Sequence, residues 1–127
     1  MIAVDTSALI AVLAQEARGP ECQAVLLDNR LIISAATLTE TLVVGSRPEL
    51  RAGIRPFLAG LDLEVISVTE ALAERAAAAY VRWGKGFHPA RLNYGDTFSY
   101  ALAQLYDCPL LYVGDDFART DVISALA

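Results

Sequence analysis

The sequence predicts a three-layer α/β/α domain built on a mostly parallel central sheet of four to five strands. Short apolar runs alternate with helix-patterned segments along the whole chain. The runs are continuously apolar, which is typical of parallel strands buried on both faces. The chain has 127 residues, of which 55% are hydrophobic, enough for one domain with a substantial core. We therefore expect residues 1–127 to form a single domain.

The strands are predicted from apolar runs that polar or turn-forming residues bound. The expected strands are residues 2–4, 31–34, 63–68 and 109–113, with a short edge strand at 122–126. Parallel neighbours require long crossover connections, usually helical. Helices are therefore expected on both faces of the sheet.

The helices are predicted from apolar residues that recur at helical spacing. The expected helices are residues 7–15, 20–29, 36–45, 49–60, 70–83 and 94–106. Pro20 suits the first turn of the second helix, and Gly45 ends the third. Pro56 predicts a kink in the fourth helix or a shorter helix. Thr69 is expected to cap the fifth, and a glycine-containing loop over residues 84–89 precedes the sixth.

The formal net charge of −5 argues against simple electrostatic binding of nucleic acid by the whole surface. However, no acidic residue falls between Glu74 and Asp96, so one flank of the protein is expected to be basic. That flank contains Arg75, Arg82, Lys85, His88 and Arg91.

The N-terminal residues and the cysteines predict a cytoplasmic protein. The first residues form a strand and lack the basic region and long apolar region of a signal peptide. No apolar run reaches the roughly 20 residues that span a membrane. Cys22 and Cys108 lack metal-type spacing and are expected to be reduced thiols.

Acidic residues recur where predicted strands end and predicted helices begin. These are Asp5, Glu40, Asp96 and the adjacent pair Asp115 and Asp116. Each alone is explained by helix capping, and Thr37 to Glu40 has the spacing of a capping box. Three other acids, Glu16, Glu70 and Asp121, are interpreted as ordinary surface residues.

Taken together, these acids predict a metal site. The carboxyl ends of parallel strands meet at one edge of the sheet, so the acids are expected to face one crevice. Two carboxylates about 4 Å apart repel by about 1 kcal/mol in water, and by more in a partly buried cleft. A hard divalent cation such as Mg²⁺ relieves that repulsion and supports attack on a phosphodiester.

The sequence contains no competing catalytic motif. It has no G-x-S-x-G elbow, P-loop or G-x-G-x-x-G sequence. His88 is expected to be an exposed residue or a phosphate contact. Thr6 and Ser7 are either helix caps or hydrogen-bond donors to a site carboxylate.

Four segments of the sequence resemble PIN-domain proteins, and more narrowly the VapC-type toxins of bacterial toxin–antitoxin pairs. The segments are Val4–Leu9, Thr39–Glu40, Leu92–Ala103 and Leu110–Phe117. The resemblance extends over essentially the whole chain, with the segments in order, and Asn-Tyr-Gly-Asp at residues 93–96 is its most specific part. The resemblance implies a PIN-like fold, a cytoplasmic homodimer and inhibition by a small cognate antitoxin.

The resemblance also implies an endoribonuclease that depends on Mg²⁺ or Mn²⁺. Asp5 and Asp96 would be the principal metal ligands, and Glu40 would be the third acid. The fourth acid would come from Asp115 or Asp116, with a slight preference for Asp116. Thr6 and Ser7 would support these acids.

The basic residues Arg82, Lys85 and Arg91 are expected to bind RNA phosphates, or else to be ordinary solvated residues. Two alternative functions are a catalytically silent PIN scaffold that only binds proteins and a receiver-like phosphoacceptor domain. The receiver would need a lysine after a late strand, whereas Lys85, the one lysine in the sequence, lies in the glycine loop.

Overall fold

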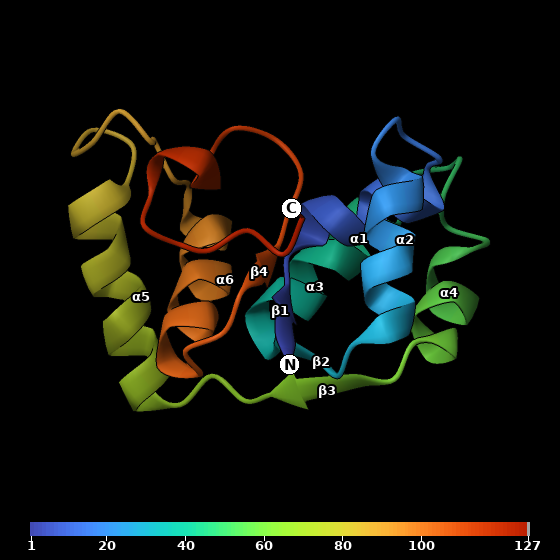
Figure 1. The fold of residues 1–127 in the computed structure, drawn as a ribbon, viewed down its shortest axis with the longest axis horizontal. Helices are drawn as coiled ribbons and strands as arrows, with labels where there is room; N and C mark the ends of the chain where they lie inside the picture. The colour runs from blue at the N-terminus through green and yellow to red at the C-terminus, as the bar shows by residue number, and fades with distance from the viewer. Residues whose placement is uncertain (127) are drawn as a thin grey trace.

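A computed structural model describes residues 1–126. Figure 1 shows its strands between two groups of helices. The elements in chain order are β1 (Ile2–Val4), α1 (Thr6–Leu13), α2 (Gly19–Asp28), β2 (Leu31–Ser34), α3 (Ala35–Val44), α4 (Ile54–Gly60), β3 (Leu63–Ile66), α5 (Glu70–Trp83), α6 (Tyr94–Leu105), β4 (Leu110–Leu111) and the 3₁₀ turn η1 (Phe117–Arg119).

The sheet has four parallel strands in the order β3-β2-β1-β4 among the described residues. The predicted α/β fold class is therefore confirmed. The chain moves outward from β1 to β2 and β3, then returns through α5 and α6 to place β4 on the other side of β1. Such a reversal opens a crevice beyond the carboxyl ends of β1 and β4, the strands between which the order reverses, and ligands of open α/β sheets bind there.

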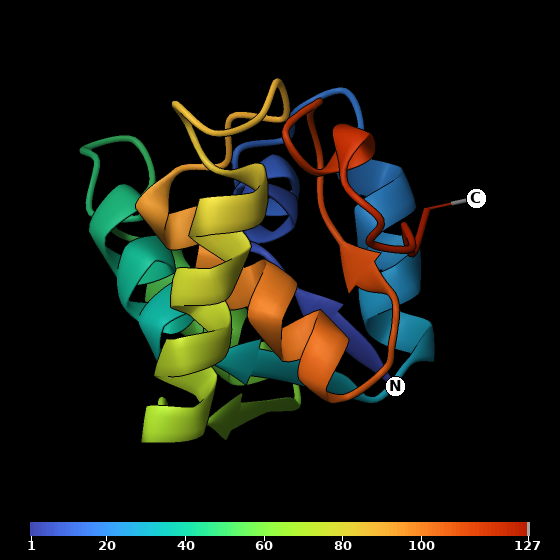
Figure 2. The ribbon, with the colours of Figure 1, turned by 90° about the vertical axis from the view of Figure 1, so that its left-hand side faces the viewer.

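Alternate residues of the central strands build two cores. Ile2 and Val4 of β1 pack with α1 and α2, whereas Ala3 between them packs with α5 and α6. Figures 1 and 2 show the resulting layers, with α5 and α6 on one side of the sheet and α2 and α4 on the other. Because both central strands are covered in this way, their side chains are fully buried.

The predicted helix over residues 49–60 is too long. Residues 47–53 form turns, in which the Arg47 carbonyl accepts the backbone N–H groups of Leu50 and Arg51 at 2.9 Å. The helix begins only at Ile54, so Pro56 falls in its first turn. A proline is tolerated there because the N–H that it lacks has no partner within the helix.

Three strand predictions also need correction. The strand predicted at 63–68 ends at Ile66. Residues 122–126 form no strand; they contribute one isolated bridge between Leu110 and Ser124. The strand predicted at 109–113 is limited to two residues because the chain leaves the sheet after Leu111. The Val113 N–H instead donates to the Ser7 hydroxyl at 3.0 Å. As a result, the end of β4 is anchored to the start of α1.

Both cysteines are free thiols, as predicted, with Cys22 buried and Cys108 half-buried. Among residues 1–126, no helix is long and apolar enough to cross a membrane.

Candidate functional site

Asp5 caps α1 and is held by donors from two helices. Its Oδ2 accepts the Ser7 N–H at 3.0 Å and the Ser7 hydroxyl at 2.6 Å, and its Oδ1 accepts the Ser99 hydroxyl at 2.6 Å. The residue is only 3% exposed. Asp5 is therefore both a helix cap and a fixed acid at the carboxyl end of β1.

Glu40 lies in the second turn of α3 and is not part of a capping box. The helix begins at Ala35, with the Ser34 hydroxyl as its cap, so the capping box predicted from Thr37 to Glu40 is wrong. The Glu40 Oε1 accepts the Thr6 hydroxyl at 2.7 Å. Burial raises the pKa of Glu40 above its usual range, and the charge of Asp5 adds to this effect.

A glycine lets α6 approach Glu40. A Cβ atom on Gly95 would lie only 2.4 Å from Glu40 Oε2, so any other residue at this position would displace the Glu40 carboxylate. The sequence Asn-Tyr-Gly-Asp therefore has a steric reason for its glycine: the backbone of the first turn of α6 lies against this carboxylate.

Asp96 is buried in the first turn of α6, where it forms the capping box of that helix. Its carboxylate accepts the Asn93 N–H at 3.0 Å, and its own N–H donates to the Asn93 side chain at 2.8 Å. Burial raises the pKa of Asp96 to about 7, and the hydrogen bond from Asn93 only partly offsets this. The charges of Asp5, Asp116 and Glu40 raise the pKa further.

Three of the predicted acids line one hollow of about 320 Å³ at the carboxyl edge of the sheet. These are Asp5, Glu40 and Asp96, and Thr6 and Ser7 line the hollow with them. We call this space the acid hollow. Of the two roles predicted for these hydroxyl residues, the structure shows hydrogen-bond donation to carboxylates: Thr6 donates to Glu40 and Ser7 donates to Asp5.

Asp115 and Asp116 are exposed and line a neighbouring space of about 300 Å³. Lys85, Arg91 and Arg119 line it too, and we call it the basic hollow. Asp116, but not Asp115, contributes to the raised pKa of Asp96. Asp116 is therefore the member of the pair that is electrostatically coupled to the acid hollow.

The remaining sequence candidates lie elsewhere. Arg82 forms an ion pair with Asp121 at 3.5 Å and lies over the Trp83 ring, and it lines neither hollow. The His88 ring packs edge-on against Trp83, and its Nδ1 accepts the Ala90 N–H at 2.9 Å. His88 therefore shapes the loop that carries Lys85 and Arg91.

Four residues at the site were not predicted as site residues. Ser99 donates to Asp5, Arg119 lines the basic hollow, and Glu16 and Arg47 line the acid hollow. Ser99 could have been found, because it lies three residues after Asp96 and so on the same face of a helix. No sequence signal marks the other three, whose positions depend on how the loops return to the sheet edge.

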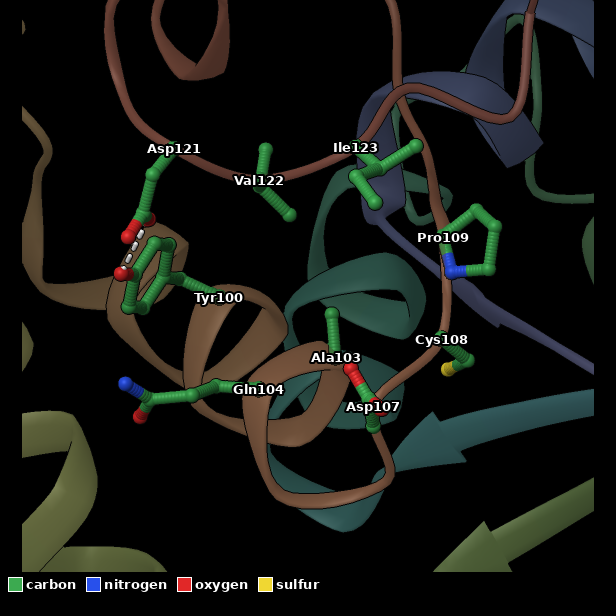
Figure 3. Close-up of a pocket in the computed structure, with 9 residues that line it drawn as sticks. All are labelled: Tyr100, Ala103, Gln104, Asp107, Cys108, Pro109, Asp121, Val122 and Ile123. Atoms are coloured by element: carbon green, nitrogen blue, oxygen red, sulfur yellow. Dashed lines mark hydrogen bonds between the residues drawn. The ribbon is translucent and has the colours of Figure 1, made fainter.

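A further hollow of about 210 Å³ lies between α6 and residues 121–123, shown in Figure 3. There the Tyr100 hydroxyl donates to Asp121 at 2.5 Å, as the dashed line marks. None of the five candidate acids lines it. This hollow is therefore separate from the acidic edge of the sheet.

The chemistry of the acid hollow fits a hard divalent cation. Within residues 1–126, no three His, Cys, Asp or Glu side chains are gathered closely enough to enclose a metal ion. Mg²⁺ does not require such a cage, since it commonly binds through one or two carboxylates and retains several waters. The acid hollow offers oxygen ligands only, and the mutual repulsion of its carboxylates is the kind that a cation relieves.

Comparison with known proteins defines the class of this protein. A sequence model described as "PIN domain" matches residues 2–123, so the chain belongs to the PIN-domain family. Within that family, the chain is similar to Ribonuclease VapC30 of Mycobacterium tuberculosis, with 40% identity over 127 residues and 94% of each chain covered. The predicted resemblance to VapC-type PIN-domain ribonucleases is confirmed.

Solved structures share the fold at lower identity. M. tuberculosis VapC20, described as a Sarcin-Ricin loop cleaving toxin, aligns with a TM-score of 0.80 and 21% identity over the full length of both chains. A toxin–antitoxin complex from Klebsiella pneumoniae aligns with a TM-score of 0.75 and 22% identity, covering 100% of this chain and 98% of that chain.

Proposed function

We propose that this chain is a single-domain, metal-dependent endoribonuclease that hydrolyses RNA phosphodiester bonds as the toxin of a VapBC-type pair. The observation that carries the proposal is the buried carboxyl of Asp96, with its pKa raised to about 7 in a hollow shared with Asp5 and Glu40. Strongly shifted acids in a cleft are typical of functional sites. The similarity to curated VapC ribonucleases supports the same activity.

In this proposal Asp5 and Asp96 hold Mg²⁺ or Mn²⁺, and Glu40 and Asp116 assist. A bound cation would lower the pKa of a water molecule and offset charge on the phosphodiester. Ser7 and Ser99 fix both oxygens of Asp5, while Asn93 orients Asp96. Glu40 Oε1 is occupied by Thr6, which leaves Oε2 to take the proton from the attacking water.

The basic hollow lies beside Asp116, where Lys85, Arg91 and Arg119 would bind a flanking RNA phosphate. Arg119 also donates to the Pro89 carbonyl at 3.2 Å, which ties η1 to the loop that carries Lys85 and Arg91. Arg82, occupied by Asp121, is a weaker candidate for this role.

We further propose that the chain acts in the cytoplasm as a homodimer and that a small cognate antitoxin inhibits it. The fold shared with a chain of a toxin–antitoxin complex supports the proposed antitoxin partner. The alternative is a PIN scaffold that binds proteins and does not cleave RNA. The acid hollow favours the enzyme, because a scaffold has no need for buried acids that repel one another.

Metal removal tests the proposed activity. The purified protein is expected to cleave RNA in the presence of Mg²⁺ or Mn²⁺ and to lose that activity in EDTA, because the acids hold the cation that activates water. Gel analysis of labelled RNA measures the cleavage, and added metal should restore it. Cleavage that persists at full rate in EDTA would exclude a metal-dependent mechanism, and the absence of RNA cleavage with either metal would favour the scaffold.

The Asp115–Asp116 pair offers a matched comparison. Asp116→Asn is expected to slow metal-dependent cleavage by about tenfold or more, the scale of losses for groups that support a metal site. Asp115→Asn is expected to have little effect, because only Asp116 is coupled to Asp96. Initial rates under identical metal concentrations measure both variants. A larger loss for Asp115→Asn would reverse the assignment.

A further inference from the structure

An arginine that no motif marks lies in the acid hollow. Arg47 follows the end of α3, and among residues 1–126 it is the one basic side chain that lines this space. Its side chain is exposed, and none of the three ion pairs found among the described residues includes it. Its guanidinium group therefore remains available to an incoming anion.

The backbone of Arg47 is held firmly, although its side chain is free. Its N–H donates to the Val44 carbonyl at 3.3 Å, and its carbonyl accepts from Leu50 and Arg51 at 2.9 Å. These bonds fix the Cα position in the turn after α3 and do not involve the side chain. A substitution at residue 47 is therefore expected to remove the charge without disturbing the turn.

The strand order places Arg47 and the basic hollow on two sides of Asp5. Arg47 follows α3, the helix after β2, whereas Asp116 and Arg119 of the basic hollow follow β4, and β1 lies between these two strands. The loop between α5 and α6 adds Lys85 and Arg91 to the basic hollow. Positive charge therefore flanks the acids on both sides. An RNA strand that crosses the acids carries phosphates in both directions from the bond to be cut.

We infer that Arg47 binds a substrate phosphate on the side of the cleavage site opposite to the one held by Lys85, Arg91 and Arg119. The RNA strand then crosses the acid hollow from Arg47 to the basic hollow, and the substrate needs phosphates on both sides of the scissile bond. This inference rests on the proposed ribonuclease function, since it assigns two subsites of the same site.

The salt dependence of cleavage tests the inference. For single strands, the logarithm of the binding constant falls with the logarithm of salt concentration by about 0.7 for each neutralised phosphate. Arg47→Ala is expected to reduce the salt slope of kcat/KM by about 0.7. It should raise KM about tenfold at low salt, which corresponds to about 1.4 kcal/mol, and leave kcat nearly unchanged.

Arg51→Ala is the matched control. Arg51 is exposed in the same turn but does not line the acid hollow, so its removal changes net charge equally without removing the contact. Arg51→Ala should keep the wild-type slope, and Arg47→Lys should largely restore it. Equal slopes for Arg47→Ala and Arg51→Ala, with the wild type active, would overturn the inference and leave the proposed function standing.

Short RNAs locate the two subsites. Substrates that keep phosphates on only one side of the cut are expected to be cleaved more slowly by the wild type. In Arg47→Ala, phosphates on one side of the cut should no longer increase the cleavage rate. In Lys85→Ala, phosphates on the other side should increase the rate less than in the wild type. Loss on the same side for both variants would contradict the proposed path, and a wild type inactive on all RNAs with Mn²⁺ would overturn both the function and the inference.

Discussion

Asp5→Asn and Asp96→Asn are each expected to slow metal-dependent RNA cleavage by more than about 100-fold. Replacing groups that only support a metal site typically costs 10- to 100-fold, so losing a carboxylate ligand should cost more. Asparagine is nearly the same size and lacks the negative charge. It still caps a helix well at position 5, and at position 96 its amide oxygen can accept the Asn93 N–H.

The measurement is the initial cleavage rate at saturating metal, with circular dichroism to verify that each variant is folded. Asp28→Asn is the charge-matched control, because Asp28 is exposed at the end of α2 and lines neither the acid nor the basic hollow. Its rate should equal that of the wild type. Cleavage at the wild-type rate by folded Asp5→Asn and Asp96→Asn would refute the assignment of both ligands.

Asp96→Asn is also expected to stabilise the metal-free protein above pH 7. The folded pKa of Asp96 is about 7, whereas the ordinary value is 3.8, so the folded state holds this proton more tightly than the unfolded state. Ionising Asp96 therefore lowers the free energy of unfolding as pH rises from about 4 to about 7, and this destabilisation is complete above pH 7. At 1.36 kcal/mol per pKa unit, that cost is at most about 4 kcal/mol.

Thermal melting without metal measures this effect as a difference between Asp96→Asn and the wild type. The difference in melting temperature should be several degrees at pH 8 and should vanish below about pH 3, where the carboxyl is protonated in both states. Mg²⁺ or Mn²⁺ at 100 times its Kd should stabilise the wild type by about 2.7 kcal/mol and leave the variant unchanged. If Asp96→Asn were less stable than the wild type at pH 8, Asp96 would be a structural cap whose ionised carboxylate does not destabilise the fold.

Most of the architecture could be predicted from sequence because each element carries a local signal. The continuously apolar strands 2–4 and 31–34 are fully buried, and Thr69 and Asn93 cap α5 and α6. The helix predicted over residues 49–60 was too long, because apolar spacing extends across the turns after Arg47. The edge strand at 122–126 was wrong, because an apolar run does not reveal how much of it pairs.

The candidate site was predictable only in part, because local sequence patterns mark helix and strand ends but not the positions of turns. Asp5 and Asp96 adjoin strand and helix ends, and both lie in the acid hollow with Glu40. The capping box predicted at Thr37 failed because α3 begins two residues earlier than that residue. Arg47 and Glu16 reach the hollow through turns that follow α3 and α1, and no pattern in the sequence encodes where such turns come to rest.

The central claim is that Asp5 and Asp96 hold a divalent cation in the acid hollow. Anomalous diffraction from crystals of the protein grown with Mn²⁺ tests it most directly, because the signal locates the ion itself. We expect a Mn²⁺ peak within coordination distance of both carboxylates in the wild type and its loss in Asp96→Asn. A wild-type crystal with Mn²⁺ bound only elsewhere, or with no peak at saturating Mn²⁺, would contradict the claim.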